Sequence, residues 1–389
     1  MAKVPMCIGR NENSGANLFF GKPGIFIPGF LYIGTVKKRE NWVIKPETIR
    51  KILVVQIRAI GDVLLTVPAL TALRRAFPEA ELNLLTDPLV GQLLEGLDCL
   101  DGLIPFPANS GLRTKISLFR QIRQSEYDLV IDYQGTPGTA QIVWFSGAPL
   151  RLGWKMQRRQ WAYNLYSQAN RQRDYVARQK CNALKELGID APLSPLRVHL
   201  KAEWVAAARQ HLDSLNLKPT ALKVNLTPLG KRQARTYPAE KMAALTRLLV
   251  NEWGAEVFYN FMPNERSYAE EVARQAGVKV HLLPDWPLTT FAAYLSLVDL
   301  HISYDNGPKH LAIALNTPTV ALFATDPPEL WHPPSLENHK AVVSTVPCRF
   351  CGLRECQLMV CMKQIEPQQI LAAAKEIPVI QNYLTEGRK

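Results

Sequence analysis

The sequence predicts an α/β protein in which two doubly wound parallel sheets face one another across a cleft. Short apolar segments alternate with amphipathic helical segments, first from residue 51 and again from near residue 220. Residues 52–55 are apolar throughout, which is typical of strands that helices cover on both faces. A chain of 389 residues suits two domains, and we expect an extension at 1–50, a first domain at 51–215 and a second at 216–389 that ends in a helix.

The first domain begins with a strand, a loop and a helix. KILVVQI (51–57) precedes the turn RAIGD (58–62), and VLLTVPALTALRRAF (63–77) then repeats apolar residues at helical spacing until Pro78. The later elements expected in this domain are strands at 81–86 and 127–135 and helices at 118–125, 174–189 and 204–216.

The second domain repeats the alternation of strands and helices. Its expected strands lie at 221–226, 255–261, 279–283, 299–305 and 319–323, and its expected helices at 239–254, 265–277, 288–298 and 310–316.

The chain is strongly basic, because 46 Lys and Arg residues against 34 Asp and Glu give a net charge of +12. Between residues 111 and 180 there are 12 basic and 4 acidic residues. The aromatic residues among them are Trp144, Trp154, Trp161, Tyr163 and Tyr166. Such a surface suits nucleic acid, a phosphorylated glycolipid or an anionic membrane, and a solvated basic face is the remaining interpretation.

We expect a cytoplasmic protein. No apolar run reaches the roughly 18 residues of a membrane span, and the first residues lack the apolar stretch of a secretory signal. Seven cysteines are too few for a disulfide scaffold. The Phe- and Gly-rich segment 16–38 is either an interfacial membrane anchor or an extension packed on the domain surface.

The turn RAIGD places Gly61 and Asp62 where a strand ends and a helix begins, the usual ligand-binding edge of an open α/β sheet. The G-x-G-x-x-G spacing of dinucleotide-binding loops is missing, which argues against a nicotinamide-dependent dehydrogenase. Asp62 is either a helix N-cap or a general base.

The loop NLTPLGKRQARTYP (225–238) is rich in groups that bind phosphate, namely Thr227, Gly230, Lys231, Arg232 and Arg235. Backbone N–H groups and cationic side chains suit a diphosphate, and an exposed basic loop is the alternative. Glu265 follows the next strand and is suited to accept hydrogen bonds from ribose hydroxyls.

The segment SYDNGPKHLAIAL (303–315) carries the most specific pattern. A strand ends at Asp305, the turn holds Asn306, Gly307 and Pro308, and a helix carries His310. N–H groups at a helix start can hold phosphate or sugar oxygens, and the Asp and His side chains can hydrogen-bond sugar hydroxyls.

Four of the seven cysteines, Cys348, Cys351, Cys356 and Cys361, lie within fourteen residues. Four thiolates suit a structural zinc ion or, less well, an iron–sulfur cluster, and reduced free thiols are the alternative.

In this order the segments resemble glycosyltransferase family 9, the bacterial heptosyltransferases of lipopolysaccharide core assembly, over residues 51–375. RAIGDVLLTVPAL is similar to the family's Gly-Asp-Val motif, RLGW (151–154) with the YN and ELG that follow to its middle region, ARTYP (234–238) to its Lys-x-Trp-Pro element and SYDNGPKHLAIAL to its Asp-Thr-Gly-x-x-His motif. The resemblance implies a GT-B fold of two Rossmann-like domains. It also implies an inverting transfer of heptose from ADP-heptose to the lipopolysaccharide inner core that requires no metal or other cofactor.

The resemblance implies roles for individual residues. Asp62 is expected to deprotonate the acceptor hydroxyl and Arg235 to stabilise the diphosphate. The other expected donor-binding residues are Thr227, Lys231, Glu265, Asp305, Asn306, Gly307, Pro308 and His310, and the expected acceptor-binding residues are Arg58, Gly61, Arg151, Trp154 and Lys155. Arg235, Tyr237 and Asn306 depart from the family's usual Lys, Trp and Thr.

The expected partners are an ADP-sugar, a phosphorylated glycolipid acceptor and the anionic cytoplasmic face of the inner membrane, contacted peripherally. A family relative with another nucleotide sugar or a surface-glycan acceptor is the first alternative. A basic nucleic-acid-binding protein explains the charge but not the segment at 303–315, and a scaffold that keeps the fold without catalysis is the third.

Overall fold

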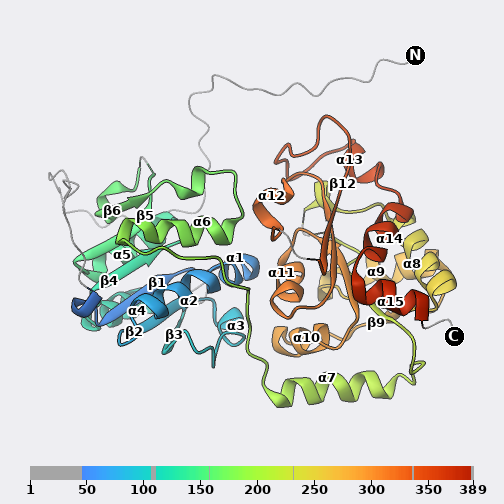
Figure 1. Ribbon diagram of the computed structural model, residues 1–389, viewed down its shortest axis with the longest axis horizontal. Helices are drawn as coiled ribbons and strands as arrows, with labels where there is room; N and C mark the ends of the chain where they lie inside the picture. Colours follow the sequence, from blue (N-terminus) through green and yellow to red (C-terminus); the bar gives the residue numbers. More distant parts are fainter. Residues whose placement is uncertain (1–45, 107–110, 157, 231, 335–336, 387–389) are drawn as a thin grey trace. The chain divides into compact units, whose positions relative to one another are not determined.

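The computed structural model describes residues 46–106, 111–156, 158–230, 232–334 and 337–386 (Figure 1). Most of the expected extension at 1–50 and the expected phosphate ligand Lys231 lie outside the described residues. The described residues belong to one compact unit, Lys38–Lys389. No helix among them is long and apolar enough to cross a membrane.

Two sheets of parallel strands, six strands each among the described residues, confirm the predicted α/β fold class. The first sheet has the strand order β3-β2-β1-β4-β5-β6, and the second has the order β12-β11-β10-β7-β8-β9. Numbered within its own sheet and read from the other edge, the second order is the same as the first, so both sheets are doubly wound in the same way. The strands of the first sheet are β1 Lys51–Val55, β2 Glu81–Thr86, β3 Gly102–Pro105, β4 Leu129–Asp132, β5 Leu150–Trp154 and β6 Leu165–Ser167. Those of the second are β7 Lys223–Leu226, β8 Glu256–Tyr259, β9 His281–Leu282, β10 Leu300–Tyr304, β11 Thr319–Phe323 and β12 His339–Val343.

Helices connect the strands. Along the first sheet they are α1 Ile60–Leu64, α2 Val67–Ala76, α3 Pro88–Gly91, α4 Leu112–Gln124, α5 Pro137–Ser146 and α6 Val176–Ala183. Along the second they are α8 Ala239–Trp253, α9 Arg266–Ala276, α10 Leu288–Leu295, α11 Gly307–Ala314, α12 Pro328–Trp331, α13 Val360–Lys363, α14 Pro367–Lys375 and α15 Pro378–Glu386. Helix α7 Ala202–Ser214 follows α6 in sequence and packs on α10. Short 3-10 turns lie at η1 Pro46–Thr48, η2 Gln160–Ala162, η3 Ala169–Arg171, η4 Leu184–Leu187, η5 Gln233–Arg235 and η6 Pro263–Glu265.

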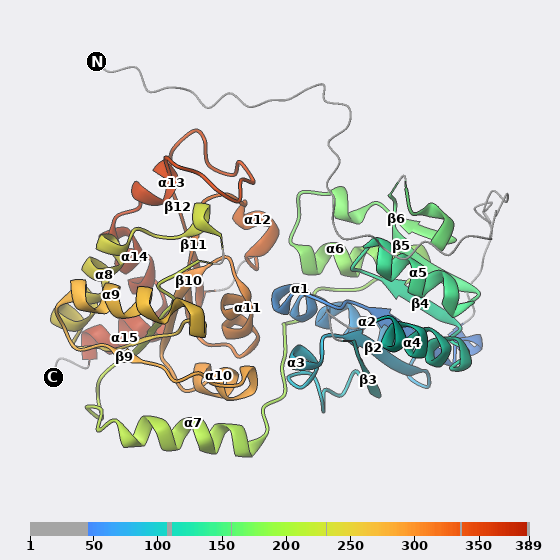
Figure 2. The same cartoon turned by 180° about the vertical axis from the view of Figure 1, so that it is seen from behind.

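Strand β1 shows why the first sheet is covered on both faces. Ile52 and Val54 belong to a buried cluster with α2 and α6, whereas Leu53 and Val55 belong to another with α4 and α5. Figures 1 and 2 show these helix pairs on opposite faces of the sheet. The alternation follows from the two-residue period of a strand, so a continuous apolar run is required here.

The second sheet is covered in the same manner. Helices α8, α9 and α14 pack with β7, β8 and β10 in one buried cluster. Helices α10 and α11 belong to the cluster that also contains α2 and α7. Helix α7 follows the first sheet in sequence but contacts α10, which belongs to the second series of elements. The expected boundary between residues 215 and 216 therefore stays a prediction.

One expected helix is wrong in detail. The segment 63–77 is not continuous, because α1 ends at Leu64 and α2 begins at Val67 with Pro68 in its first turn. Proline lacks the N–H that a continuous helix uses and is favoured at a helix start. The break makes α1 a separate short helix, and α1 carries Asp62.

Candidate active site

The loop between β1 and α1 is anchored by Gln56. Its Nε2 donates to the Arg58 carbonyl oxygen at 2.8 Å and to Gln134 Oε1 at 3.0 Å. Gln134 Oε1 also accepts the Arg58 N–H at 2.9 Å. These bonds fix the loop beside the end of β4, so α1 starts at the carboxyl edge of the first sheet.

Asp62 is half-buried in the first turn of α1. Its Oδ2 accepts the N–H of Ala59, the N-cap residue, at 3.3 Å. The side chain is therefore held by the start of the helix, although Asp62 itself is the third helical residue and not the N-cap. A carboxylate bound by one N–H keeps lone pairs for another proton donor, so the geometry is compatible with a base.

Lys180 of α6 is buried against the segment that runs from Gln56 to Thr66. Its ammonium group donates to Gln56 Oε1 at 2.9 Å, to the Asp62 carbonyl oxygen at 2.6 Å and to Thr66 Oγ1 at 2.8 Å. Burial lowers the pKa of Lys180 to about 8, against the opposing effect of the Asp62 charge. The three bonds join the end of β1 to both α1 and the start of α2.

The start of α11 is set by Asn306, whose Oδ1 accepts the Lys309 N–H at 3.0 Å. Gly307 and Pro308 are the first two residues of the helix. An asparagine N-cap followed by proline in the first turn is a favoured helix start. The turn predicted at 306–308 is therefore present, and it places the Gly307 N–H at the carboxyl edge of the second sheet, since Pro308 has no N–H and the Lys309 N–H is bonded to Asn306.

Helices α1 and α11 approach closely through their glycines. A Cβ on Gly61 would lie 2.6 Å from His310 Cδ2, and one on Gly307 would lie 3.2 Å from Ile60 Cβ. The two most specific motifs of the sequence are thus in contact. The Asp62 charge acts on His310, where it slightly opposes the fall in the His310 pKa.

Asp305, Lys309 and His310 form a buried cluster at this contact. Lys309 Nζ donates to Asp305 Oδ1 at 2.8 Å and to the Trp331 carbonyl oxygen at 2.6 Å. His310 Nε2 lies 3.5 Å from the same Asp305 oxygen. Among the described residues, His310 Nδ1 is buried and has no hydrogen-bond partner.

Burial and neighbouring charges shift the pKa values of Asp305 and His310. Burial tends to raise the pKa of Asp305, but the Lys309 charge and the hydrogen bonds from His310 and Lys309 outweigh it, so the pKa falls well below its usual value. Burial, together with the charge of Lys309, lowers the pKa of His310 to about 4. At neutral pH Asp305 is therefore a carboxylate and His310 a neutral imidazole, which offers one donor and one acceptor nitrogen.

Arg235 joins this cluster to the end of β11. Its NH1 donates to the carbonyl oxygen of Asp305 at 2.9 Å and to Asp305 Oδ2 at 3.3 Å. Its Nε donates to Thr325 Oγ1 at 3.0 Å, and its NH2 donates to Asp326 Oδ2. These acceptors take four of the five guanidinium N–H groups. In this conformation Arg235 positions two carboxylates, and one of its N–H groups has no acceptor among the residues that the structure describes.

Thr227 and Glu265 are less directly connected to the cluster. Thr227 is buried at the end of β7, and its hydroxyl donates to Asn260 Oδ1 at 2.8 Å. Glu265 Oε2 accepts the Met262 N–H at 2.9 Å and so closes the η6 turn. Both follow neighbouring strands of the second sheet, as the sequence predicts, but their ligand contacts stay predictions.

The expected acceptor residues are not all brought together. Gly61 and Arg58 lie beside Asp62, and the Trp154 indole donates to the Tyr133 carbonyl oxygen at 2.9 Å, next to Gln134. Arg151 lies at the other end of β5, where it donates to the Ala148 and Ala162 carbonyl oxygens at 2.6 and 2.9 Å. Lys155 is exposed just beyond β5.

The four clustered cysteines are free thiols, of which Cys348 and Cys351 are exposed and Cys361 is buried. Burial, and then the nearby thiols of the other three, raise the pKa of Cys361. In the part of the chain that the structure describes, no three His, Cys, Asp or Glu side chains are arranged to hold a metal ion. In this arrangement the thiols do not fit a metal, and metal binding stays a prediction.

Sequence reasoning missed three contributors to the site, namely Lys309, Lys180 and Asp326. Lys309 had a readable signal, because it lies in the first turn of a helix that starts two residues after Asp305, and side chains four residues apart can meet at such a point. Asp326 follows the carboxyl end of β11 and was equally visible by position. Lys180 had none, since its contacts are 114 to 124 residues away.

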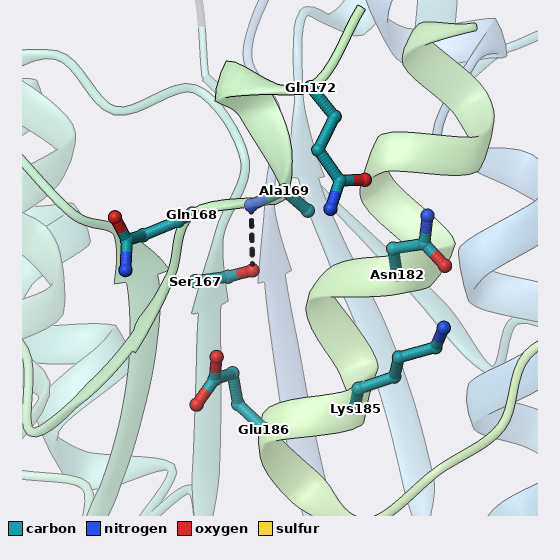
Figure 3. Close-up of a pocket in the computed structure, with 7 residues that line it drawn as sticks. All are labelled: Ser167, Gln168, Ala169, Gln172, Asn182, Lys185 and Glu186. Carbon is teal, nitrogen blue, oxygen red and sulfur yellow. Dashed lines mark hydrogen bonds between the residues drawn. The ribbon is translucent and has the colours of Figure 1, made fainter. Parts of the chain in front are cut away.

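A cavity of about 300 Å³ lies elsewhere in the first half of the chain. Figure 3 shows its lining side chains, which come from the end of β6, the segment after it, α6 and η4. None of the predicted site residues lines it, and its lining includes one cation and one anion, Lys185 and Glu186. The contact between α1 and α11, not this cavity, is therefore the candidate active site.

Comparison with known proteins bears on the family of the chain. The family described as glycosyltransferase family 9 (heptosyltransferase) matches residues 115–361. Lipopolysaccharide heptosyltransferase 1 of Salmonella typhimurium is 26% identical over 299 residues, which cover 71% of this chain and 89% of that protein.

Two solved structures share the fold. A family 9 glycosyl transferase of Veillonella parvula superposes with a TM-score of 0.74 at 22% identity and covers 86% of this chain and 97% of its own. An Escherichia coli heptosyltransferase with ADP-2-deoxy-2-fluoro heptose has a TM-score of 0.63 at 20% identity, over 84% of this chain and 99% of its own.

Proposed function

The chain belongs to glycosyltransferase family 9 and is a glycosyltransferase, and from this premise we propose that it transfers heptose from ADP-heptose to the lipopolysaccharide inner core. The donor is inferred from the relatives, one of which was solved with a fluorinated ADP-heptose. The acceptor is inferred from the relative named lipopolysaccharide heptosyltransferase 1. A relative that uses another nucleotide sugar or a surface-glycan acceptor is the main alternative.

The contact of α1 with α11 is the observation that carries the proposal. It places Gly61, the residue before Asp62, against the ring of His310, whose Nε2 lies 3.5 Å from Asp305 Oδ1. The Asp62 carboxylate accepts the proton of an acceptor hydroxyl while that oxygen bonds to the anomeric carbon. The bond from this carbon to the diphosphate breaks, ADP leaves with the electron pair, and attack from the opposite face inverts the configuration.

The buried cluster of Asp305, Lys309 and His310 supports the proposal that a sugar binds here. Asp305 is fixed as an acceptor by Lys309, and neutral His310 carries a ring nitrogen that lacks a partner among the described residues. These groups are suited to hydroxyls, which both donate and accept. Heptose is rich in hydroxyls, so the cluster fits a sugar better than an apolar group.

The diphosphate is proposed to lie at the start of α11 and the loop after β7. The Gly307 N–H and the NH2 group of Arg235 are suited to anionic oxygens. Pro308 has no N–H and is proposed to line the same turn, and Thr227 is proposed to join the set by turning its hydroxyl from Asn260 Oδ1 to the ligand. Asn306 and Lys231 complete the proposed set, and Glu265 is proposed for the ribose. No metal or other cofactor is proposed for this chemistry.

The acceptor is proposed to be a phosphorylated glycolipid that reaches Asp62 from the anionic cytoplasmic face of the inner membrane. Arg58 and Gly61 adjoin the base, and Trp154 and Lys155 extend the same edge of the first sheet. Arg151 is the weakest member, because it lies at the opposite end of β5. The excess positive charge suits an anionic acceptor.

The first experiment measures calorimetric binding of ADP-heptose, other nucleotide sugars and free ADP, UDP and GDP, together with turnover of Asp62→Asn. We expect selective binding of ADP-heptose. The variant should lose at least about a hundredfold in turnover, because general-base catalysis contributes this much, while donor affinity stays nearly unchanged. An amide oxygen can still accept the Ala59 N–H, so the helix start should persist.

Asp87→Asn is the matched control, since Asp87 also uses its carboxylate at a helix start, where it accepts the Leu89 N–H at 2.9 Å. It should keep full turnover. Unchanged turnover in Asp62→Asn refutes the base, and selective binding of another nucleotide sugar replaces the donor.

A further inference from the structure

A cluster of aromatic and basic side chains lies on the surface formed by α4, α5 and η2. Phe119, Arg120 and Arg123 come from α4, Trp144 and Phe145 from α5, and Trp161 from η2. We call these six residues the aromatic–basic surface. Five of them and Gln124 line an open groove of about 550 Å³ between α4 and α5.

The aromatic rings form a continuous group. The ring centroids of Phe119 and Phe145 are 5.3 Å apart, those of Trp144 and Phe145 5.0 Å, and those of Trp144 and Trp161 6.1 Å. Trp144, Phe145 and Trp161 are nevertheless 36%, 43% and 42% exposed. Such a contiguous apolar group on a surface indicates an interaction site, whereas isolated exposed residues do not.

Helix α5 does not need these rings to attach to the sheet. Its inner side already buries Ala140, Ile142 and Val143 in the core cluster with β1 and β4. Trp144 and Phe145 therefore add apolar surface on a second side of the helix. A helix that is apolar on more than one side normally has a second apolar environment to enter.

The charge beside the rings has one sign. Residues 112–124 of α4 contain Arg113, Lys115, Arg120 and Arg123, and no Asp or Glu. All four basic side chains are exposed, as is Ile116 between them. Basic residues that alternate with bulky apolar ones are typical of protein segments that lie on anionic lipid.

We infer that the aromatic–basic surface docks on an anionic lipid bilayer. Trp and Phe rings favour the boundary between headgroups and acyl chains, and guanidinium groups bind lipid phosphates. A second copy of the chain is a poor occupant, because a two-fold contact would bring the four cations of α4 against four more. The surface deepens the proposed function, since it holds the enzyme beside a membrane-borne acceptor.

The test uses the full chain and vesicles without any sugar nucleotide, so its result is independent of the proposed transfer reaction. Co-sedimentation is measured with phosphatidylcholine vesicles and with vesicles that contain roughly 30% phosphatidylglycerol, a content typical of anionic membrane surfaces. We expect binding to the anionic vesicles that weakens with salt.

The double variant Lys115→Glu/Arg120→Glu should bind anionic vesicles at least about tenfold more weakly, since each cation near the membrane contributes about 1 kcal/mol. Trp144→Ser/Phe145→Ser should reduce the part of binding that survives high salt. The matched control is Arg209→Glu/Lys279→Glu, which makes the same charge change at exposed positions of α7 and after α9. It should lose clearly less.

Circular dichroism melting verifies that each variant is folded, and melting like that of the wild type is the condition for including a variant. Equal vesicle binding by all variants, or no binding of the wild type, overturns the inference. So does a preference for a single-stranded oligonucleotide over anionic vesicles that the charge reversal abolishes, because this result assigns the surface to nucleic acid.

Discussion

The position of Asp62 depends on the buried side chain of Lys180. It bonds the end of β1, the Asp62 carbonyl oxygen and Thr66, each at 2.9 Å or less. Loss of this group would leave buried acceptors unpaired, at about 1–3 kcal/mol each. Lys180 is therefore a positioning residue for the proposed base, not a group that touches substrate.

The lowered pKa of Lys180 gives a pH-dependent prediction. Its pKa is about 8 in the folded chain and 10.5 ordinarily, so between these values the unfolded chain binds more protons. The free energy of unfolding should consequently rise with pH across this window, by at most about 1.4 kcal/mol per pH unit. In Lys180→Met this contribution should vanish, and urea unfolding at pH 7 to 10 measures the difference in slope.

Lys185→Met is the control, because Lys185 is exposed and lies five residues further on, in η4, which directly follows α6. It should unfold with the wild-type slope. Identical slopes for wild type and Lys180→Met would show that Lys180 keeps an ordinary pKa in the folded chain.

The chemistry of Arg235 shows what sequence cannot give at the scale of a residue. The motif predicts a cation near the diphosphate, and the structure does place Arg235 at the correct loop. Its partners are Asp305 and Asp326, which lie 70 and 91 residues away. Which acceptors a guanidinium meets depends on how β10 and β11 end side by side, and no local pattern contains this information.

At the scale of elements, the crossing of α1 and α11 depends on Gly61. A methyl group there would lie 2.6 Å from the buried His310 ring, so helix and ring cannot both keep their positions. Gly61→Ala should therefore lower kcat/KM at least about tenfold, since overpacking of this kind costs about 1–3 kcal/mol. Steady-state kinetics with the identified donor provides the measurement.

Gly138→Ala in α5 is the matched control, because a Cβ there meets nothing within 4 Å. This variant should keep wild-type kcat/KM. If Gly61→Ala is equally active, the contact between α1 and α11 is not required for the reaction.

The segment that carries the four cysteines packs on the loops that follow β7 and β11, where the donor is proposed to bind. The Phe350 and Gly352 N–H groups donate to the Ala324 and Thr325 carbonyl oxygens, and the Cys356 N–H donates to Gln233 Oε1 at 2.8 Å. It therefore supports both the η5 loop with Arg235 and the end of β11.

Metal binding by these cysteines stays a prediction that elemental analysis can decide. On the metal hypothesis, the protein should contain about one zinc ion per chain, or an iron chromophore, and Cys351→Ser should lose it. Chelation should also weaken ADP binding, because the segment supports the η5 loop. Cys99→Ala is the control and should keep the metal. A folded, metal-free wild type would leave reduced thiols as the interpretation.

Buried strands were the elements most readily predicted, because parallel strands covered on both faces require continuous apolar runs such as 52–55. Elements with mixed composition were missed. Strand β6 is three residues long, and β12 begins with His339 and Lys340, so neither shows a period. The split of 63–77 into two helices was visible only as Pro68.

At the scale of the whole molecule, helices from both strand–helix series share one hydrophobic core. One cluster contains Val63 of α1, Leu70 of α2, Leu212 of α7 and Leu295 of α10. The sequence predicts two separate domains from its repeated alternation, and periodicity cannot reveal that helices of both series share a core. Local patterns report which side of an element is apolar, but not which partner covers it.

This shared core predicts cooperative unfolding. The wild type should show one calorimetric transition, because separation of the two sheets would expose apolar surface of α7 and α10. Trp286 contributes to this contact, as its ring centroid lies 4.9 Å from that of His211 and 5.5 Å from that of Tyr294. Trp286→Ala should weaken the free energy of this contact by about 2 kcal/mol, somewhat less than the cost for a fully buried tryptophan. The single calorimetric transition should then separate into two. Trp161→Ala makes the same change at an exposed site and should retain one transition. Two transitions already in the wild type would mean that the sheets unfold independently despite their common cluster.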